Sequence, residues 1–204
     1  MNINKPSKIV IDKSEISKFS CGEYVFQEKL DGEFAIRSFG ECILAGELLR
    51  GEFIAFDCVA LNGHDVRKHI LNSRIGFRNH VAEINGIKTV PANRNAMPFF
   101  DDIMRSGGEG VVIKSVNSTY YDPMYAVKRL QTFICRVGSI IAGKQSVTIF
   151  DAATGQCRGN VALRGGKTDM VRIGSLVKVE GFGETNAGKI REPRPDAREW
   201  LLQY

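Results

Sequence analysis

The sequence predicts a two-domain α+β protein, in which a mixed first domain ends near residue 130 and a small β-barrel follows. Short strand patterns recur along the whole chain, whereas helical patterns occur only between about residues 65 and 105. From Phe133 onward, short strands alternate with glycine turns. A chain of 204 residues can bury one good core or two small ones, so its length permits both domains.

Alternating and β-branched residues mark the strands of the first domain. We expect six strands there, at Tyr24–Gln27, Phe34–Arg37, Cys42–Ala45, Phe53–Val59, Gly110–Lys114 and around Tyr125–Leu130. Two helices lie between the fourth and fifth strands. The first is expected within Asp65–Glu83, on an imperfect apolar face of Val66, Ile70, Ile75 and Val81. The second covers Pro98–Arg105 and stops at Gly107-Gly108.

The last third of the chain has a different pattern. It predicts short strands at Arg136–Ala142, Ser146–Phe150, Gly159–Leu163 and Leu176–Glu180, with no convincing helix before the C-terminus. Five or so short strands in roughly 70 residues are typical of a small barrel, and the OB-fold is the obvious candidate.

Composition excludes several classes of protein. No apolar run approaches the roughly 20 residues needed to cross a bilayer, and residues 1–18 lack the apolar core of a signal peptide. The five cysteines are scattered, which predicts reduced thiols in a cytoplasmic protein. The net charge of +5 is uneven, because residues 131–204 carry +4 of it. That basic excess is available for phosphates, although a solvated surface explains it equally well.

The segment Glu28-Lys29-Leu30-Asp31-Gly32 ends one expected strand and turns into the next. A lysine there can point its amine into a cleft, and lysine becomes a nucleophile when neighbouring cations or desolvation lower its pKa. Attack on the α-phosphate of ATP would give a lysyl phosphoramidate. Alone, K-x-D-G is a weak motif, and a hairpin turn with an exposed lysine explains it as well.

The order of the motifs that follow strengthens this interpretation. Acids and bases lie on or at the ends of several further strands: G-E-L at Gly46-Glu47-Leu48, F-D at Phe56-Asp57, E-G-V-V-I-K at Glu109–Lys114 and V-K-R at Val127-Lys128-Arg129. Near the end of the chain, R-E-P-R at Arg191–Arg194 is part of a basic segment stiffened by proline. This ordered set resembles the covalent nucleotidyltransferase superfamily, specifically the ATP-dependent DNA ligases in a minimal two-domain form. The resemblance runs from about Tyr24 to Arg198.

The resemblance implies a fold and roles for individual residues. The fold would be an ATP-grasp-like nucleotidyltransferase core of antiparallel sheets with helices at 1–130, followed by an OB-fold at 131–204. Lys29 would be adenylylated, with Asp31 assisting at the ribose or metal. Lys114 and Lys128 would contact the α-phosphate. The other nucleotide contacts would come from Glu28, Glu47 at the ribose hydroxyl, Phe56 at adenine, and Arg191 and Arg194 at the pyrophosphate.

The implied chemistry requires ATP and a divalent cation, Mg²⁺ or Mn²⁺, for which Glu109 and Glu47 are the candidate ligands. Carboxylate oxygens suit such an ion, and nucleotidyl transfer depends mostly on positioning and charge neutralisation. The implied partner is nicked double-stranded DNA, bound by a monomer with no membrane attachment. Candidate phosphate contacts in the second domain are Arg136, Lys144, Arg164 and Lys167. The small size suits a phage-encoded or accessory bacterial enzyme.

The sequence departs from the ligase pattern in three places. Most DNA ligases have arginine five positions after the motif lysine, where this chain has Phe34. Arg37 comes eight positions after the lysine and would replace that arginine only across a strand bulge. Only eight residues separate Glu47 from Phe56, which makes Glu52 a rival for the acidic role. The basic strand usually reads K-x-K, and its first position here is Ala126.

Two other functions fit parts of the pattern. RNA ligases and RNA-capping nucleotidyltransferases also carry K-x-D-G, sometimes without the arginine. A non-catalytic nucleic-acid-binding protein would explain Phe34 and Ala126. A protein that has lost its chemistry would not be expected to retain together Lys29, Asp31, Glu109, Lys114 and Lys128.

Overall fold

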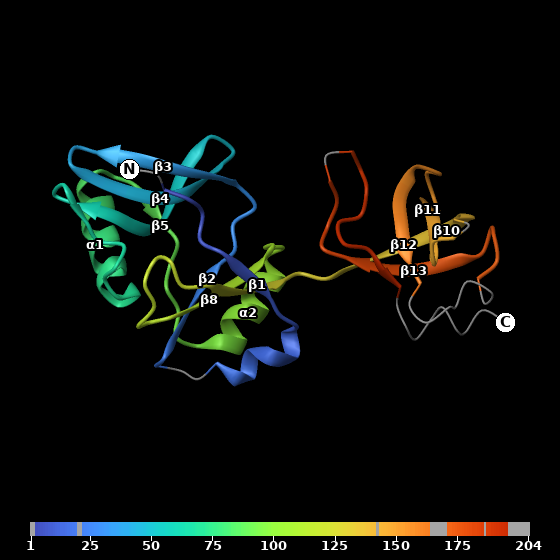
Figure 1. Cartoon of the computed structure of the whole chain (residues 1–204), viewed down its shortest axis with the longest axis horizontal. Coiled ribbons are helices and arrows are strands. Elements are labelled where there is room, and N and C mark those ends of the chain that lie inside the picture. Colours follow the sequence, from blue (N-terminus) through green and yellow to red (C-terminus); the bar gives the residue numbers. More distant parts are fainter. Residues whose placement is uncertain (1–2, 20–21, 142, 164–170, 186, 196–204) are drawn as a thin grey trace. The chain divides into compact units, whose positions relative to one another are not determined.

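The computed structural model describes residues 3–19, 22–141, 143–163, 171–185 and 187–195. The chain forms two compact units, Met1–Lys128 and Arg129–Tyr204. Figure 1 shows the first unit with both α-helices and the second built from strands. No helix in the described ranges is long and apolar enough to cross a membrane.

The first sheet of unit 1 has the strand order β1-β9-β8-β2. Its strands are β1 (Lys8–Val10), β9 (Met124–Lys128), β8 (Gly110–Ser115) and β2 (Tyr24–Glu28). β1 runs parallel to β9, whereas the other two pairs are antiparallel. The sequence pattern did not predict β1, because a strand of three residues is too short to show alternation.

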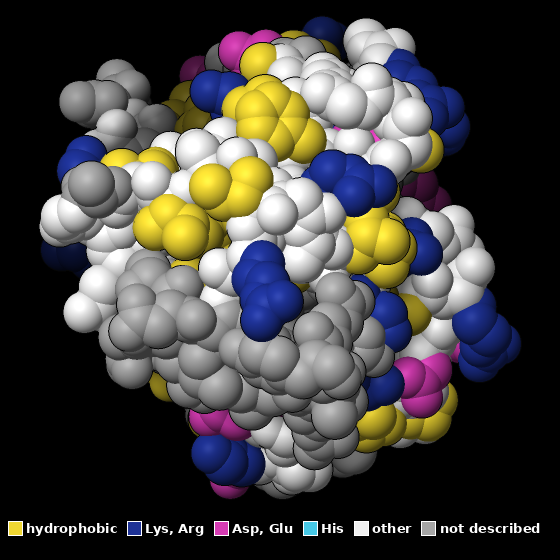
Figure 2. Space-filling view, turned by 90° about the vertical axis from the view of Figure 1, so that its right-hand side faces the viewer, with side chains coloured by type: hydrophobic (Ala, Val, Ile, Leu, Met, Phe, Trp, Pro, Cys, Tyr) yellow, Lys and Arg dark blue, Asp and Glu magenta, His cyan; other side chains and the backbone are white. Residues whose placement is uncertain are grey.

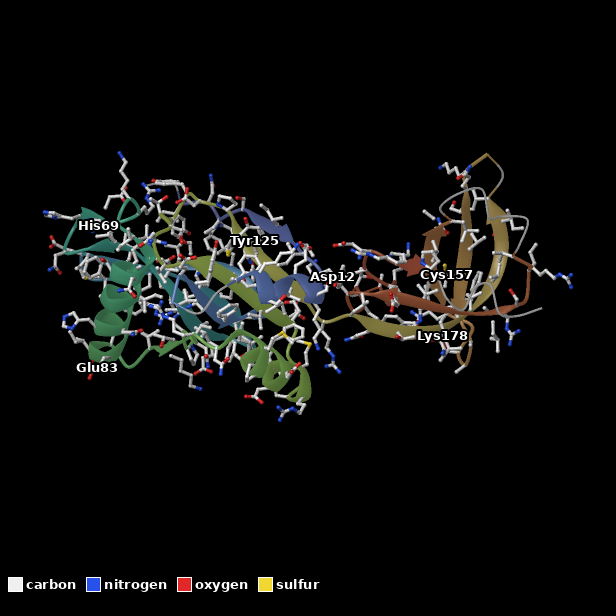
Figure 3. All side chains as sticks on the ribbon, turned by 90° about the horizontal axis from the view of Figure 1, so that it is seen from below. Asp12, His69, Glu83, Tyr125, Cys157 and Lys178 are labelled. Atoms are coloured by element: carbon white, nitrogen blue, oxygen red, sulfur yellow. The ribbon has the colours of Figure 1, made fainter. Side chains whose placement is uncertain are left out.

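One face of this sheet packs against helix α2 (Ala96–Arg105) and the 3₁₀ helix η1 (Lys13–Lys18). Phe26, Ile113 and Val127 supply the buried side chains from the sheet. Asp12 caps η1, since its carboxylate accepts from the backbone N–H of Ser14 at 2.9 Å. Figure 3 labels Asp12 and Tyr125, whose ring packs on this same face with its centroid 4.9 Å from that of Phe19.

The second sheet has the order β3-β4-β5-β6, and β7 pairs with β5 in parallel. The strands are β3 (Glu33–Phe39), β4 (Cys42–Leu49), β5 (Glu52–Leu61), β6 (His64–Asp65) and β7 (Lys88–Thr89). One face packs against helix α1 (Leu71–Ile84) around Leu44, Phe53 and Val81. The other face buries Ala45, Phe56 and Tyr120.

Helix α1 differs from its sequence prediction. It starts at Leu71, so Val66 and Ile70 precede it, and Ile70 is exposed. The buried face of the helix carries Arg74 and Arg78, each only 1% exposed. The apolar periodicity is weak for this reason: two of the positions that face the sheet hold charged residues.

The described residues of unit 2 form a five-stranded sheet in the order β12-β11-β10-β13-β14, with every pair antiparallel. Its strands are β10 (Gln131–Ile141), β11 (Ser146–Asp151), β12 (Cys157–Ala162), β13 (Leu176–Gly181) and β14 (Arg194–Pro195). Figure 3 labels Cys157 on β12 and Lys178 on β13. The backbone N–H of Ile190 donates to the carbonyl of Arg158 at 3.0 Å and joins the segment after β13 to β12.

Candidate nucleotide-binding site

A pocket lined by charged and apolar side chains opens in unit 1 on the face of the first sheet opposite η1 and α2. Residues from the N-terminal segment, both sheets and the loops beside them line it: Lys5, Lys8, Gln27, Glu28, Lys29, Leu30, Glu47, Phe56, Val90, Val112, Lys114 and Met124. Strand alternation explains this face. Phe26 and Ile113 are paired and enter the core, whereas the neighbouring pair Gln27 and Val112 faces the pocket.

Lys29 follows directly after β2 and is held at both its backbone and its side chain. Its backbone N–H donates to the carbonyl of Gly110 at 2.8 Å, and its amine forms an ion pair with the carboxylate of Glu109. Both side chains are mostly buried, with exposed fractions of 11% and 20%. Gly110 permits this arrangement, because a Cβ there would lie 2.1 Å from the carbonyl oxygen of Val127. The structure thus brings K-x-D-G and E-G-V-V-I-K together.

Glu47 connects the same loop to the second sheet. Its Oε2 accepts from the backbone N–H of Gly32 at 3.1 Å, and its Oε1 accepts from the amine of Lys5 at 2.6 Å. A Cβ on Gly32 would lie 2.6 Å from the carbonyl oxygen of Leu48, so the loop approaches β4 closely only with glycine. Glu52, the rival acid, instead pairs with Lys88 at the surface. Of these two acids, Glu47 is therefore the one that lines the pocket.

Phe56 and Lys114 form the inner wall of the pocket. The amine of Lys114 lies 4.9 Å from the centroid of the Phe56 ring, a cation–π distance. Lys114 is 7% exposed, and burial lowers its pKa to about 8, opposed by the negative charge of Asp57. The ring of Phe34 lies 6.3 Å from that of Phe56 and extends the aromatic surface.

Arg37 does not reach the pocket. β3 and β4 pair from Glu33 to Phe39 without a bulge, so the shift that Arg37 would need is absent from these strands. The guanidinium of Arg37 lies 5.4 Å from the ring centroid of Phe53, a residue of the core under α1. The position five after Lys29 thus presents the ring of Phe34, and Arg37 belongs to the other face of the sheet.

Of the remaining residues that the sequence predicted for the site in unit 1, one lines the pocket and two do not. Glu28 lines the pocket, whereas Asp31 and Lys128 are not among the lining residues. Asp31 is exposed in the loop after Lys29, and Lys128 ends β9 opposite Gly110.

The expected residues of unit 2 are exposed where the structure describes them. Arg191 is exposed, and Arg194 on β14 places its guanidinium 4.8 Å from the ring centroid of Phe182. Arg136 donates to the carbonyl of Gly174 at 2.7 Å, and Lys144 is exposed. Arg164 and Lys167 lie outside the described residues. In Figure 2, Lys and Arg side chains are scattered over the visible face instead of forming one patch.

Three polar lining residues were not expected from the sequence: Lys5, Lys8 and Gln27. Gln27 is 2% exposed, and neither its amide nitrogen nor its amide oxygen has a hydrogen-bond partner among the described residues. Strand alternation alone could have placed Gln27 on the face of Lys29. The positions of Lys5 and Lys8 depend on the pairing of β1 with β9, and the sequence pattern does not predict β1.

No family model matches the sequence, and no curated protein matches it in sequence. Its structure is similar to that of Lig E DNA ligases, described as DNA binding with a minimal scaffold, at a TM-score of 0.67 and 18% identity over 95% of this chain and 98% of that one. It is also similar to mycobacterial DNA ligase D complexed with ATP and MES, at a TM-score of 0.55 and 15% identity over 93% of each chain.

The ligase domain of LigD from M. tuberculosis gives a TM-score of 0.53 and 14% identity over 95% of this chain and 94% of that one. The chain therefore has the fold of the DNA ligases. The resemblance to the ATP-dependent DNA ligases is confirmed at the level of the fold, and it includes the minimal Lig E form.

Proposed function

We propose that this protein is an ATP-dependent DNA ligase that seals nicks between a 3′-hydroxyl and a 5′-phosphate in duplex DNA, acting as a monomer. The observation that carries the proposal is Lys29, which forms an ion pair with Glu109 and lines a pocket together with Lys114, Glu47 and Phe56. An amine, further cations for phosphates and an aromatic ring for a base are the groups that nucleotidyl transfer needs.

In the proposed first step, the free amine of Lys29 attacks the α-phosphorus of ATP. The N–P bond forms, the bond from the α-phosphorus to the bridging oxygen breaks, pyrophosphate leaves and the amine loses one proton. Lys114 and Lys128 balance the charge on the α-phosphate, and Phe56 stacks on adenine. Glu47 binds the ribose hydroxyl, and Asp31, next to the Gly32 whose N–H donates to Glu47, assists at the ribose or the metal.

The two later steps use DNA. An oxygen of the 5′-phosphate attacks the phosphorus of the lysyl-AMP, which breaks the P–N bond and moves AMP to the DNA end. The 3′-hydroxyl then attacks the 5′-phosphorus, forms the phosphodiester bond and releases AMP. The Lig E structure is described as one of DNA binding with a minimal scaffold, which supports duplex DNA as the partner.

The residues of the pocket fit a divalent cation bound together with the nucleotide. The described residues hold no group of three or more His, Cys, Asp or Glu that could bind a metal ion by itself. Mg²⁺ commonly takes one or two carboxylates, with phosphate oxygens and waters as its other ligands. We assign this role to Glu109, because its carboxylate lies against the amine of Lys29, which is the proposed position of the α-phosphate. When bound, the ion would neutralise charge on the phosphates.

We propose that unit 1 is the adenylyltransferase domain and that unit 2 is an OB-fold barrel. The strand order β12-β11-β10-β13-β14 and the hydrogen bond from Ile190 to Arg158 support the barrel, because they bring the two ends of the sheet together. Arg191 and Arg194 are the proposed contacts of this domain to the ATP pyrophosphate. Arg136 and Lys144 are its proposed contacts to DNA phosphates.

The test is incubation with α-labelled ATP or GTP and Mg²⁺, followed by denaturing electrophoresis. Label from ATP that is absent in Lys29→Ala and discharged by nicked DNA supports the ligase. Lys88→Ala, which removes a surface amine, should label like the wild type. Label from GTP alone would identify a capping enzyme, and discharge by nicked RNA alone an RNA ligase. A folded protein that takes no label from either nucleotide would be a non-catalytic nucleic-acid-binding protein.

A further inference from the structure

The N-terminal segment before η1 is built into the wall of the pocket. The hydroxyl of Tyr120 donates to the carbonyl of Asn4 at 3.2 Å, and the amine of Lys5 pairs with Glu47 at 2.6 Å. Backbone hydrogen bonds to β9 follow: Met124 N–H donates to Ser7 at 3.1 Å, and Ile11 N–H donates to Ala126 at 3.0 Å. These bonds fix the backbone of β1 on both sides of Lys8.

Lys8 faces the pocket from β1. In the parallel register, Lys8 lies beside Met124, and both side chains line the pocket. The next residue, Ile9, is exposed on the alternate side of the strand. Among the described residues, the amine of Lys8 has no hydrogen-bond or ion-pair partner, although Lys5 and Lys29, its neighbours in the pocket, both have one.

The surroundings of Lys8 leave its charge incompletely balanced. Burial, Lys29 and Lys5 lower the pKa of Lys8 to about 8, and Glu47 and Glu109 act in the opposite direction. Both acids are already engaged with other amines. A cation that is held in place without a partner is suited to an anionic group that enters the pocket.

The position of Lys8 also relates to a departure in the sequence. Ala126 occupies the position on β9 where the K-x-K pattern would have its first lysine. Ala126 lies two residues after Met124, so it has the same orientation in the sheet, and it is completely buried. Its partner on β1 is Val10, two residues after Lys8. Lys8 therefore brings an amine to the pocket from the strand adjacent to the one that lacks it.

We propose that Lys8 binds a non-bridging phosphate oxygen of the nucleotide beside Lys29, and that it supplies from β1 the charge absent at Ala126. The inference rests on the proposed function, because it assumes that ATP occupies this pocket. It adds a phosphate-binding residue that the strand motifs do not contain. Lys5 has a different part, since its amine is engaged in holding Glu47.

The test is equilibrium binding of ATP and of adenosine by calorimetry without a divalent cation, so that contacts to the phosphates are separated from contacts to the nucleoside. Lys8→Gln should weaken ATP binding about tenfold and leave adenosine binding unchanged. Lys8→Arg, which keeps the charge, should retain most of the ATP affinity. Lys13→Ala is the matched control, because Lys13 lies in the same N-terminal region and its exposed amine pairs with Asp101.

The outcomes separate the inference from the proposed function. An equal loss of ATP and adenosine affinity in Lys8→Gln would show that Lys8 only supports the wall of the pocket, and the inference would be overturned. Unchanged ATP binding in Lys8→Gln would also overturn the inference. The proposed function would still stand in that case, provided that the wild type ligates nicked DNA. A wild type that binds neither ATP nor adenosine would overturn both the inference and the proposed function. Thermal unfolding of each variant confirms that the folded protein is compared.

Discussion

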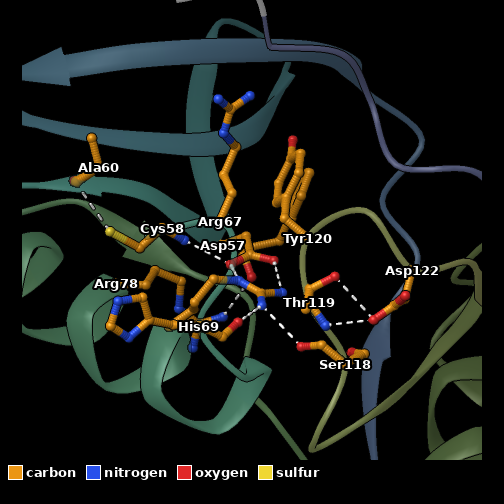
Figure 4. A network of polar contacts seen from close by, with 12 residues as sticks. Asp57, Cys58, Ala60, Arg67, His69, Arg78, Ser118, Thr119, Tyr120 and Asp122 are labelled. Carbon is orange, nitrogen blue, oxygen red and sulfur yellow. Dashed lines mark hydrogen bonds and ion pairs between the residues drawn. The ribbon is translucent and has the colours of Figure 1, made fainter. Parts of the chain in front are cut away.

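Asp57 and Arg74 form a two-pronged ion pair with both side chains almost completely buried. Nε of Arg74 lies 2.9 Å from Oδ1 of Asp57, and Nη2 lies 3.1 Å from Oδ2. Arg74 also donates to the carbonyls of His69 and Ser118, so it ties α1 to β5 and to the loop after β8. Figure 4 labels three of its partners, Asp57, His69 and Ser118. This network adjoins the pocket, since Asp57 follows Phe56 on β5.

Removal of Arg74 should therefore destabilise the fold strongly. Arg74→Ala leaves the carboxylate of Asp57 buried without its partner, which costs about 3–5 kcal/mol of unfolding free energy. Lys88→Ala, which breaks the exposed pair with Glu52, should cost less than about 1 kcal/mol. Urea unfolding of both variants measures the difference. Equal midpoints would show that the buried pair contributes no more than the surface one.

We expect replacement of Gln27 by leucine to stabilise the fold and to weaken nucleotide binding. Gln27→Leu replaces an amide without partners by an apolar side chain of similar size, so we expect a gain on the order of 1 kcal/mol in unfolding free energy. The same change should weaken ATP binding, because it removes a polar group without a partner from the lining of the pocket. Gln145→Leu, at an exposed loop position, is the control. A loss of stability in Gln27→Leu would contradict the prediction.

Glu47 and Glu52 should differ in their effect on adenylylation. Glu47→Gln breaks the charge pairing with Lys5 inside the pocket, and we expect the rate of labelling by ATP to fall at least about tenfold. Glu52→Gln should leave that rate unchanged, because Glu52 pairs with Lys88 at the surface. Single-turnover labelling compares the two. A larger defect in Glu52→Gln would reverse the assignment of the acid.

The buried Lys114 should produce a pH dependence of stability above neutral pH. Burial lowers its folded pKa to about 8, whereas an unfolded lysine has a pKa of about 10.4. Between these values the unfolded chain binds more protons, so the free energy of unfolding should rise with pH. Lys114→Met should lose this contribution, and Lys8 remains in both proteins. Unfolding between about pH 8 and about pH 10.4 tests this, and parallel profiles would refute it.

Binding to nicked DNA should depend strongly on salt. Lys and Arg contacts to phosphates release counterions, so affinity should fall about tenfold or more between about 50 mM and about 200 mM salt. Arg136→Ala should lower the slope of log affinity against log salt by about one. Fluorescence anisotropy with a nicked duplex provides the measurement. An affinity that does not change with salt would exclude a binding surface based on phosphate contacts.

The sequence predicted most strands of both units, because β2, β5 and β8 carry clear alternation or apolar runs. It failed where tertiary contacts replace local pattern. Helix α1 buries Arg74 and Arg78 against the sheet, so its apolar face is incomplete. β1 has three residues and is defined by pairing with β9, which lies more than a hundred positions away in sequence.

The candidate site, too, could be predicted where a local sequence pattern exists and not where tertiary contacts decide. The motifs predicted Lys29, Glu47, Phe56 and Lys114 on the pocket because each ends or lies on a recognisable strand. The choice between Glu47 and Glu52 required the observed hydrogen bonds of each acid. The face on which Arg37 lies could be decided only from the register of β3 with β4, because a shift of one residue moves a side chain to the other face.

The bonded N-terminal segment has a practical consequence for producing the protein. Ile3 packs beside Phe56, and Asn4 is bonded to Tyr120. An affinity tag or fusion partner joined ahead of Ile3 would therefore emerge next to the lysines of the pocket. An acidic linker placed there would compete with ATP for those amines. Preparations tagged at opposite ends should give different apparent affinities for nucleotide until the tag is cleaved.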